Sequence, residues 1–372
     1  MCKRALFWVT LYCEAATSIV TGQAIRINEI QVIGSHNSYH AGLGPNEMAY
    51  LRKQNARAAE SLDYSHPALT VQLNAGVRQL EIDVYGDAKG GLFAKPAWPG
   101  LMAKAGFALD PPFDPAGVML KPGFKVLHAQ DLDYRSNCQP FVSCLEEVRA
   151  WSKAHPRHLP VFILIENKDG RSRPEYMIEP EPLTAETFDR LDAEIRSAFR
   201  AGELITPDDV RGRSRTLEVA VLKSGWPTVE KARGKVMFVL DQERVTPLYT
   251  KGHPSLEGRA IFTNSTPGTP DAAFVKMNNP LGEKIAEAVR KGYLVRTMSD
   301  PGAAGVKAGD TKKRDAALAS GAQMVSTDYP LNEKAAGSGY SVRFEGSSSN
   351  VRCNPVLKAA GCRLDLLGEA AR

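Results

Sequence analysis

The sequence predicts an α/β fold in which eight parallel strands alternate with helices and close into a barrel. Three observations favour this fold. Short apolar runs, most of them four to seven residues long, alternate along the chain with segments of helical period. At three places a helical segment ends in a glycine directly before the next strand, as β/α units do. No G-x-G-x-x-G follows the first strand, which disfavours the alternative of an open, doubly wound sheet that binds dinucleotides.

The predicted strands are continuous apolar runs, and several are rich in Val and Ile. Such runs are typical of strands that are buried on both faces of a parallel sheet. Eight of them joined by helices form a TIM-type (β/α)8 barrel. They are expected over 29–34, 78–84, 125–128, 161–166, 235–241, 260–262, 293–297 and 323–327.

Helix signals lie between these strands. Apolar residues recur at helical spacing over 188–199. Thr206 followed by Pro207 predicts a helix start, because threonine caps a first turn and proline suits the first helical position. Further helices are expected over 279–291 and 310–320, each followed by a glycine and a strand.

Two regions interrupt the alternation. Residues 88–123 carry six prolines and no clear period, and they follow the second strand, which places them on the functional rim of a barrel. They form either a lid or membrane-touching loop, or a loop folded over its own apolar cluster. The tail after Pro330 is rich in Gly and Ser. We therefore expect a barrel domain over 25–335 and a small C-terminal appendage over 336–372, packed on the barrel and stapled by a disulfide.

The N-terminus resembles a secretory signal peptide. Two basic residues, Lys3 and Arg4, precede a mostly apolar stretch with small residues at the −3 and −1 positions of a cleavage point. A signal peptide over 1–24 would make the protein secreted or periplasmic. The alternative is a buried N-terminal helix.

Four cysteines follow this segment in two close pairs, Cys138 with Cys144 and Cys353 with Cys362. In an oxidising compartment two short-loop disulfides are expected, whereas in the cytosol all four would be free thiols. A zinc site is disfavoured, since there is no C-x-x-C and no histidine at ligand spacing.

The charge is mildly basic, with a formal net charge of +5 and an isoelectric point of about 8.8. No block of five like charges occurs, so nucleic acid is not an expected partner. A basic surface suits an anionic phosphate ester or an anionic membrane surface.

Ionisable side chains follow the apolar runs at strand carboxyl ends, where barrel enzymes place their sites. Glu81 and Asp83 are two apart in one strand, so both side chains point to the same face. Neighbouring carboxylates repel unless a cation compensates them. With Glu166 and the amide oxygen of Asn37 they form an all-oxygen set, which suits Ca²⁺ or Mg²⁺ and not zinc.

Two histidines at other strand ends, His36 and His128, would supply the acid and base that phosphodiester cleavage requires. Lys168 and Arg296 would neutralise charge that builds on the phosphate. Each of these residues has a structural alternative, because a lone strand-end histidine is more often a hydrogen-bonding scaffold. Their occurrence at successive strand ends favours a functional site.

Three further polar residues remain open. Asp241 and Asp328 either bind substrate hydroxyls or tie the rim together. His40 is expected to cap a loop. We assign these three residues no catalytic role from the sequence.

Four segments together carry a resemblance to a known family. They read IGSHNSYH over 33–40, QLEID over 79–83, IENK over 165–168 and GAQMVSTDY over 321–329. In this order they resemble the bacterial calcium-dependent phosphoinositide-specific phospholipase C family. The resemblance runs from about Asn28 to Pro330 and into the tail.

The resemblance implies a TIM barrel that binds one Ca²⁺, with Mg²⁺ less suited, and cleaves the bond between diacylglycerol and the phosphoinositol head group. The four oxygen-bearing residues named above would hold the ion. His36 would stabilise the transition state, and His128 would protonate the leaving alkoxide. Lys168 and Arg296 would contact phosphate or head group. A monomer with peripheral membrane contact through 88–123 is expected.

Three other functions compete with this one. In glycerophosphodiester phosphodiesterases, which act on soluble deacylated esters, Arg-Gly follows the first histidine and Asp follows the second. Here Asn37-Ser38 and Ala129-Gln130 stand there. A sphingomyelinase-D-like lyase is a weaker alternative. A non-catalytic barrel that binds inositol phosphate or lipid would tend to lose a histidine or a metal carboxylate, and all are present.

Overall fold

The computed structural model describes residues 24–170, 176–345 and 350–369. The predicted signal peptide therefore lies outside the described residues, apart from Ala24.

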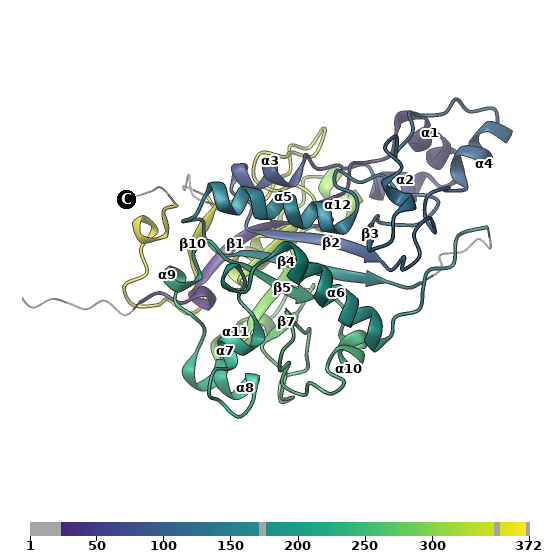
Figure 1. The fold of residues 1–372 in the computed structure, drawn as a ribbon. Helices are drawn as coiled ribbons and strands as arrows, with labels where there is room; N and C mark the ends of the chain where they lie inside the picture. Colours follow the sequence, from purple (N-terminus) through teal and green to yellow (C-terminus); the bar gives the residue numbers. More distant parts are fainter. Residues whose placement is uncertain (1–23, 171–175, 346–349, 370–372) are drawn as a thin grey trace, which may run out of the picture.

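Eight parallel strands form a nearly closed barrel, which confirms the predicted fold class (Figure 1). Neighbouring strands follow the order β6-β5-β4-β2-β1-β9-β8-β7. An isolated parallel bridge between Asn264 and Phe274 joins the two ends of this path. The strands are β1 (Ile30–Ser35), β2 (Gln79–Tyr85), β4 (Val161–Lys168), β5 (Val236–Leu240), β6 (Ile261–Phe262), β7 (Phe274–Lys276), β8 (Leu294–Met298) and β9 (Met324–Thr327).

The strand prediction is wrong at one segment and misses another. Segment 125–128 forms β3 (Lys125–Val126), which pairs antiparallel with the end of β2 and stays outside the parallel ring. β4 pairs directly with β2 in its place. The missed strand is β7, which has only three residues, and its short apolar run over 272–275 is too brief to distinguish a strand from a loop.

Helices pack around the outside of the barrel (Figure 1). The predicted face of α6 is buried through Phe188, Leu191 and Ile195. The α-helices are α1 (Pro45–Gln54), α2 (Ala56–Ser61), α3 (Leu69–Ala75), α4 (Trp98–Lys104), α5 (Phe141–Ala154), α6 (Ala185–Ala198), α7 (Pro207–Arg211), α8 (Leu217–Val219), α9 (Val229–Ala232), α10 (Thr246–Tyr249), α11 (Lys284–Lys291), α12 (Ala303–Lys307) and α13 (Lys312–Ala319).

The observed helix boundaries agree with two of the predicted starts and ends and differ from one. Thr206 caps α7 as predicted, because its side chain accepts a hydrogen bond from the backbone N–H of Asp209. Gly292 ends α11 in the left-handed conformation, as expected. The predicted start at 279 is too early, since Gly282 has a φ of 90° and cannot belong to a right-handed helix.

Residues 88–123 pack over an apolar cluster that they share with α1, α2 and Tyr134. Trp98 and Met102 of α4 are buried against Tyr50 of α1 and against Tyr134. This unit projects beyond the carboxyl ends of the strands, at the edge of the barrel mouth (Figure 1). Its exposed apolar side chains are limited to positions such as Leu120, so most of the apolar content serves packing.

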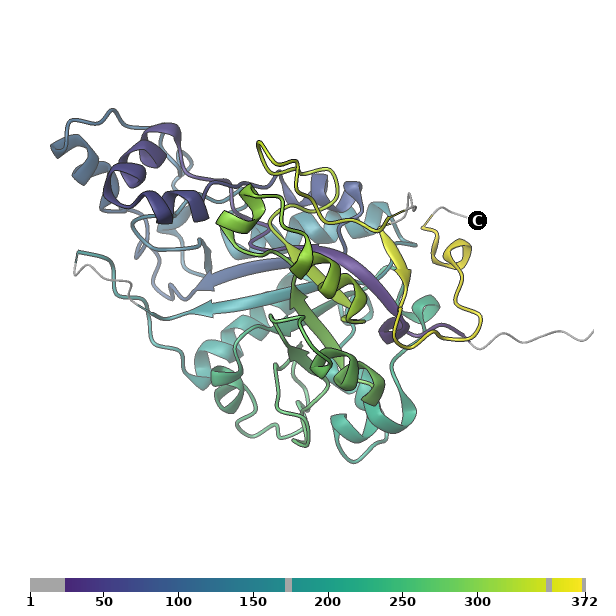
Figure 2. The same ribbon diagram turned by 180° about the vertical axis from the view of Figure 1, so that it is seen from behind.

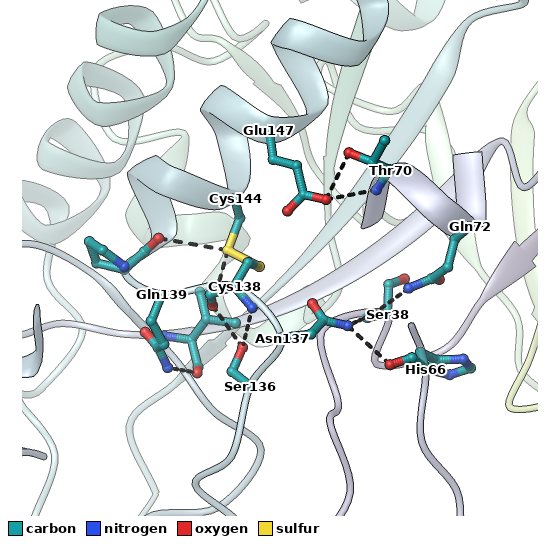
Figure 3. Close-up of a disulfide and its surroundings, with 12 residues drawn as sticks. Ser38, His66, Thr70, Gln72, Ser136, Asn137, Cys138, Gln139, Cys144 and Glu147 are labelled. Carbon is teal, nitrogen blue, oxygen red and sulfur yellow. Dashed lines mark hydrogen bonds between the residues drawn. A yellow bond between two sulfur atoms is a disulfide. The ribbon is translucent and has the colours of Figure 1, made fainter. Parts of the chain in front are cut away.

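The tail returns to the barrel through β10 (Val351–Cys353), which pairs antiparallel with β1 (Figure 2). Both predicted disulfides are present, Cys138–Cys144 and Cys353–Cys362. Beside the first of them, Asn137 donates hydrogen bonds to the backbone carbonyls of Ser38 and His66 (Figure 3). The disulfide loop therefore supports the loop that follows β1.

No helix within the described part of the chain has the length and apolar character needed to cross a membrane.

Candidate active site

The carboxyl ends of the parallel strands bring distant residues together at one mouth. β2 contributes Glu81 and Asp83, and β4 contributes Glu166. One carboxylate oxygen from each of these three residues lies within 4.8 Å of the others. We call this set the carboxylate trio.

The trio contains oxygens that lack good partners. Asp83 is fully buried and neither of its oxygens accepts a well-aligned hydrogen bond, although Lys168 Nζ lies 3.0 Å from its Oδ2. Burial raises the pKa of Asp83, and the charge of Lys168 opposes that shift. Burial, and then the charge of Asp83, also raise the pKa of Glu166. Three close carboxylates, one of which has two buried oxygens without a hydrogen-bond partner, fit a hard cation such as calcium.

Two basic side chains already neutralise the trio. Lys168 lies between two carboxylates, with its Nζ also 2.9 Å from Glu166 Oε2. Burial would lower the pKa of Lys168, but the charges of these carboxylates raise it well above its usual range. Arg296 donates to Glu81 and to the hydroxyl of Ser326, and its side chain is almost completely buried. Lys168 and Arg296 therefore lie in the site as ion-pair partners of the carboxylate trio.

Asn37 follows β1 in the left-handed backbone region, with a φ of 47°, which asparagine tolerates better than most residues. Its amide nitrogen donates to the hydroxyl of Tyr64 at 2.8 Å. The next residue, Ser38, is tied to Glu81 by two hydrogen bonds, from its backbone N–H to the Glu81 carbonyl and from the Glu81 N–H to its hydroxyl. These bonds hold the β1 loop against the strand that carries the trio.

His36 is oriented by carboxylates on both sides of its ring. Its Nδ1 donates to Asp328 Oδ1 at 2.7 Å, and its Nε2 lies 3.6 Å from Glu81 Oε1. Burial would lower the pKa of His36, but the charges of Glu81 and then Asp328 outweigh it and raise the pKa to about 9. Asp328, whose role the sequence leaves open, is thus a partner of this histidine.

His128 lies just beyond β3 and is held by a residue that the sequence analysis does not select. Its Nδ1 bonds Asp133 Oδ2 at 2.8 Å, and the same carboxylate bonds His40 Nε2 at 3.0 Å. Burial would lower the pKa of His128, but the hydrogen bond to Asp133 and the charge of that carboxylate outweigh burial and raise the pKa. Asp133 is itself buried, and its two histidines hold its pKa well below its usual range despite that burial.

Asp133 could not be selected because it comes directly after a turn, five residues after His128, and a second acidic residue, Asp131, lies beside it. His40 does more than cap a loop, since its ring is completely buried on Asp133. The geometry therefore adds two carboxylates, Asp133 and Asp328, each of which fixes one histidine through Nδ1.

Comparison with known families and structures agrees with this geometry. Residues 25–355 match the family model described as phosphoinositide phospholipase C, Ca²⁺-dependent. No curated protein matches the chain.

Two solved structures illustrate the likeness in fold. The calcium-dependent phosphoinositol-specific phospholipase C from the Gram-negative Pseudomonas sp., in its apo form, is 16% identical with a TM-score of 0.53, over 88% of this chain and 95% of that one. The Ca²⁺-dependent phosphatidylinositol-specific phospholipase C from Streptomyces antibioticus is 19% identical with a TM-score of 0.50, over 82% and 95%. At such identities these structures support the barrel alone. The family match covers most of the chain, which therefore belongs to the calcium-dependent phosphoinositide phospholipase C family of phosphodiesterases.

Proposed function

We propose that this enzyme cleaves phosphatidylinositol between diacylglycerol and the phosphoinositol head group, with His36 and His128 as its acid–base pair. One observation carries the proposal. Each histidine is bound through Nδ1 to a carboxylate, while 29% and 27% of the two side chains remain exposed beside the carboxylate trio. A ring held at Nδ1 presents Nε2 to a substrate in a fixed tautomer.

Calcium is the proposed cofactor, as one ion held by the trio and Asn37. When bound, it would lower the pKa of the attacking inositol hydroxyl and balance the charge of the phosphate. The compact trio supports a single ion, and a set of protein oxygens with few waters suits Ca²⁺ better than Mg²⁺.

Each polar side chain at the barrel mouth would have its own role in the cleavage. His36 would donate from Nε2 to the phosphate oxygens as their charge grows, and His128 would protonate the leaving alkoxide. A carboxylate of the trio, Glu81 or Glu166, would accept the proton of the attacking inositol hydroxyl. Arg296 would keep Glu81 oriented. Without calcium, Lys168 would neutralise part of the negative charge of the trio. With calcium bound, its ammonium group would be available to contact the phosphate. Attack by the substrate's own hydroxyl makes positioning a large part of the acceleration.

The proposed partner is a phospholipid at a membrane surface, bound by a monomer. Exposed apolar side chains occur on three loops that follow barrel strands, at Leu109 and Leu120, at Tyr176 and at Leu281. Apolar side chains exposed at a barrel mouth favour contact with lipid. The two disulfides support a secreted or periplasmic location. The division into a barrel over 25–335 and an appendage over 336–372 also remains a proposal.

The test is turnover of phosphatidylinositol and, separately, of glycerophosphoinositol, with calcium, magnesium or chelator, followed by phosphorus NMR. We expect calcium-dependent release of inositol phosphate from the lipid, with loss of turnover in His36→Ala and in His128→Ala. His155→Ala, a change at an exposed histidine outside the site, is the matched control and should keep full activity. Turnover of only the deacylated ester would contradict the lipid assignment.

The metal assignment has its own readout. Calcium should raise the melting temperature of the wild type and leave that of Asp83→Asn almost unchanged, because the variant loses a ligand that is buried inside the trio. An equal rise in both proteins would show that the ion binds elsewhere.

A further inference from the structure

A buried carboxylate, Asp300, lies directly behind the strand end that carries Asp328. It follows β8 and is only 5% exposed. Its Oδ1 accepts hydrogen bonds from the hydroxyls of Thr327, at 2.6 Å, and Tyr340, at 3.1 Å. Its Oδ2 accepts one from the backbone N–H of Asp328, at 2.7 Å. The hydroxyl of Ser299 also donates to Oδ1, at 3.4 Å. Four donors therefore converge on one side chain.

The contacts of Asp300 lead directly to His36. The residues that it holds, Thr327 and Asp328, are the ones that bind His36. The Thr327 carbonyl accepts the backbone N–H of His36 at 2.9 Å, and the Asp328 carboxylate accepts its Nδ1–H at 2.7 Å. Both the backbone and the ring of His36 are thus attached to groups that Asp300 fixes.

Asp300 occupies an unfavourable place for a negative charge. Burial, and then the charge of Asp328, raise the pKa of Asp300 to about 6. Lys313 Nζ donates to the backbone carbonyl of Asp300 and not to its carboxylate. Every group at the carboxylate oxygens donates to them. The backbone N–H of Asp328 can only donate and so requires an acceptor, whereas the hydroxyls of Thr327 and Tyr340 can also accept.

We propose that Asp300 is a positioning residue for catalysis, which holds Asp328 by its backbone so that the Asp328 carboxylate keeps His36 in its working orientation. Asp300 makes no hydrogen bond to the trio or to the ring of His36, so it acts on the orientation of that ring through Asp328. The inference rests on the proposed role of His36 and adds a residue to it.

A double-mutant cycle tests this path. With phosphatidylinositol and saturating calcium, Asp300→Ala should lower kcat by roughly 10–100-fold, as removal of an outer partner of a site residue does, with little change in KM. The same change in an Asp328→Ala background should lower kcat by less than about twofold, because the path is already broken. Losses that multiply in the double variant would overturn the proposal.

Two milder substitutions, Asp300→Asn and Tyr340→Phe, provide further tests beside the double-mutant cycle. Asp300→Asn keeps an acceptor for the Asp328 N–H and should retain most of the activity. Tyr340→Phe removes one bond to Asp300 and leaves its carboxylate in place. It should cause a smaller fall in kcat, which disappears in the Asp328→Ala background. These two variants keep the test available if Asp300→Ala does not fold.

A matched control separates positioning from stability. Asp192 on α6 is also buried and also accepts a bond from a buried tyrosine, Tyr249, at 2.6 Å. Asp192→Ala should lower the melting temperature and leave kcat of the folded enzyme unchanged. If Asp300→Ala behaves in the same way, Asp300 is merely structural and the proposal fails.

One readout needs no substrate, so the failure of the proposed function and of this inference are distinguishable. The Nδ1 proton of His36 in its bond to Asp328 should give a slowly exchanging, downfield NMR signal. We expect this signal to be lost in Asp328→Ala and Asp300→Ala and kept in Asp300→Asn and Asp192→Ala. An unchanged signal in Asp300→Ala would refute the inference, whether or not phosphatidylinositol is turned over.

Discussion

Acid is expected to destabilise this enzyme through one buried histidine, His158, which lies at the amino end of the barrel, far from the proposed chemistry along the strands. Its Nδ1 donates to the carbonyl of Leu159 at 2.5 Å, so its Nε2 accepts from the hydroxyl of Ser152 at 2.7 Å. Only 1% of the residue is exposed. Burial lowers the pKa of His158 to about 4; the Leu159 carbonyl opposes this shift and the charge of Arg78 adds to it.

The magnitude follows from proton linkage. The unfolded chain takes up a proton at His158 near pH 6.5, whereas the folded protein does so only near pH 4. Between these values the unfolded state binds more protons, so the stability due to His158 is complete above pH 6.5 and is lost as the pH falls. The loss between pH 8 and pH 5 is about 2 kcal/mol, and its limit below pH 4 is about 3 kcal/mol.

The assay is urea unfolding at pH 8, 7, 6 and 5, for the wild type and His158→Gln. Other groups titrate in both proteins, so the relevant quantity is the difference between their free energies of unfolding. This difference should shrink by about 2 kcal/mol from pH 8 to pH 5, because glutamine does not titrate. His155→Gln, a change at the exposed neighbour, should leave the slope of the wild type intact. A constant difference between the wild type and His158→Gln would refute the reasoning.

Three further changes have expected outcomes. Asp133→Asn should lower kcat roughly 10–100-fold, because an uncharged amide stabilises the protonated ring of His128 less and its NH2 would face His40, and steady-state kinetics should show no loss if His128 needs no anchor. Lys168→Met should lower the melting temperature without calcium and enlarge the rise that calcium produces, and an equal rise in both proteins would mean that Lys168 does not balance the trio. Glu369→Gln should cost about 1–3 kcal/mol in urea unfolding, since Glu369 is the carboxylate partner of the buried Arg78, and an unchanged midpoint would show that the tail contact carries no stability.

The candidate site shows how far strand-end patterns reach. Glu81 and Asp83 are predicted to share a face because side chains in a strand alternate with a period of two, and the structure places them together with Glu166 in the trio. His36 and His128 are selected by a different local signal, because each is an ionisable residue that follows an apolar run. The part of the prediction that depends on local periodicity therefore identifies most of the candidate residues.

The partners of those residues do not follow from local periodicity. Arg296 pairs with Glu81, which lies 215 positions earlier, and Asp328 binds His36 across 292 positions. Asp300 comes two residues after the end of β8, but the sequence gives no sign of its partner, and its role becomes visible only through its contact with Asp328. Such pairs form because the barrel closes, and no short stretch of sequence reports which strand ends will meet.

Local spacing and composition are enough to predict the barrel class, the two disulfides as one of two states of the cysteine pairs, and the ionisable residues that follow the strands. Three features follow from the closed barrel alone: β3 lies outside the ring, β7 completes the ring, and Lys168 and Arg296 neutralise carboxylates. The physical reason is that ionic and hydrogen-bonded partners are chosen by distance in space, and barrel closure sets those distances after the local elements have formed.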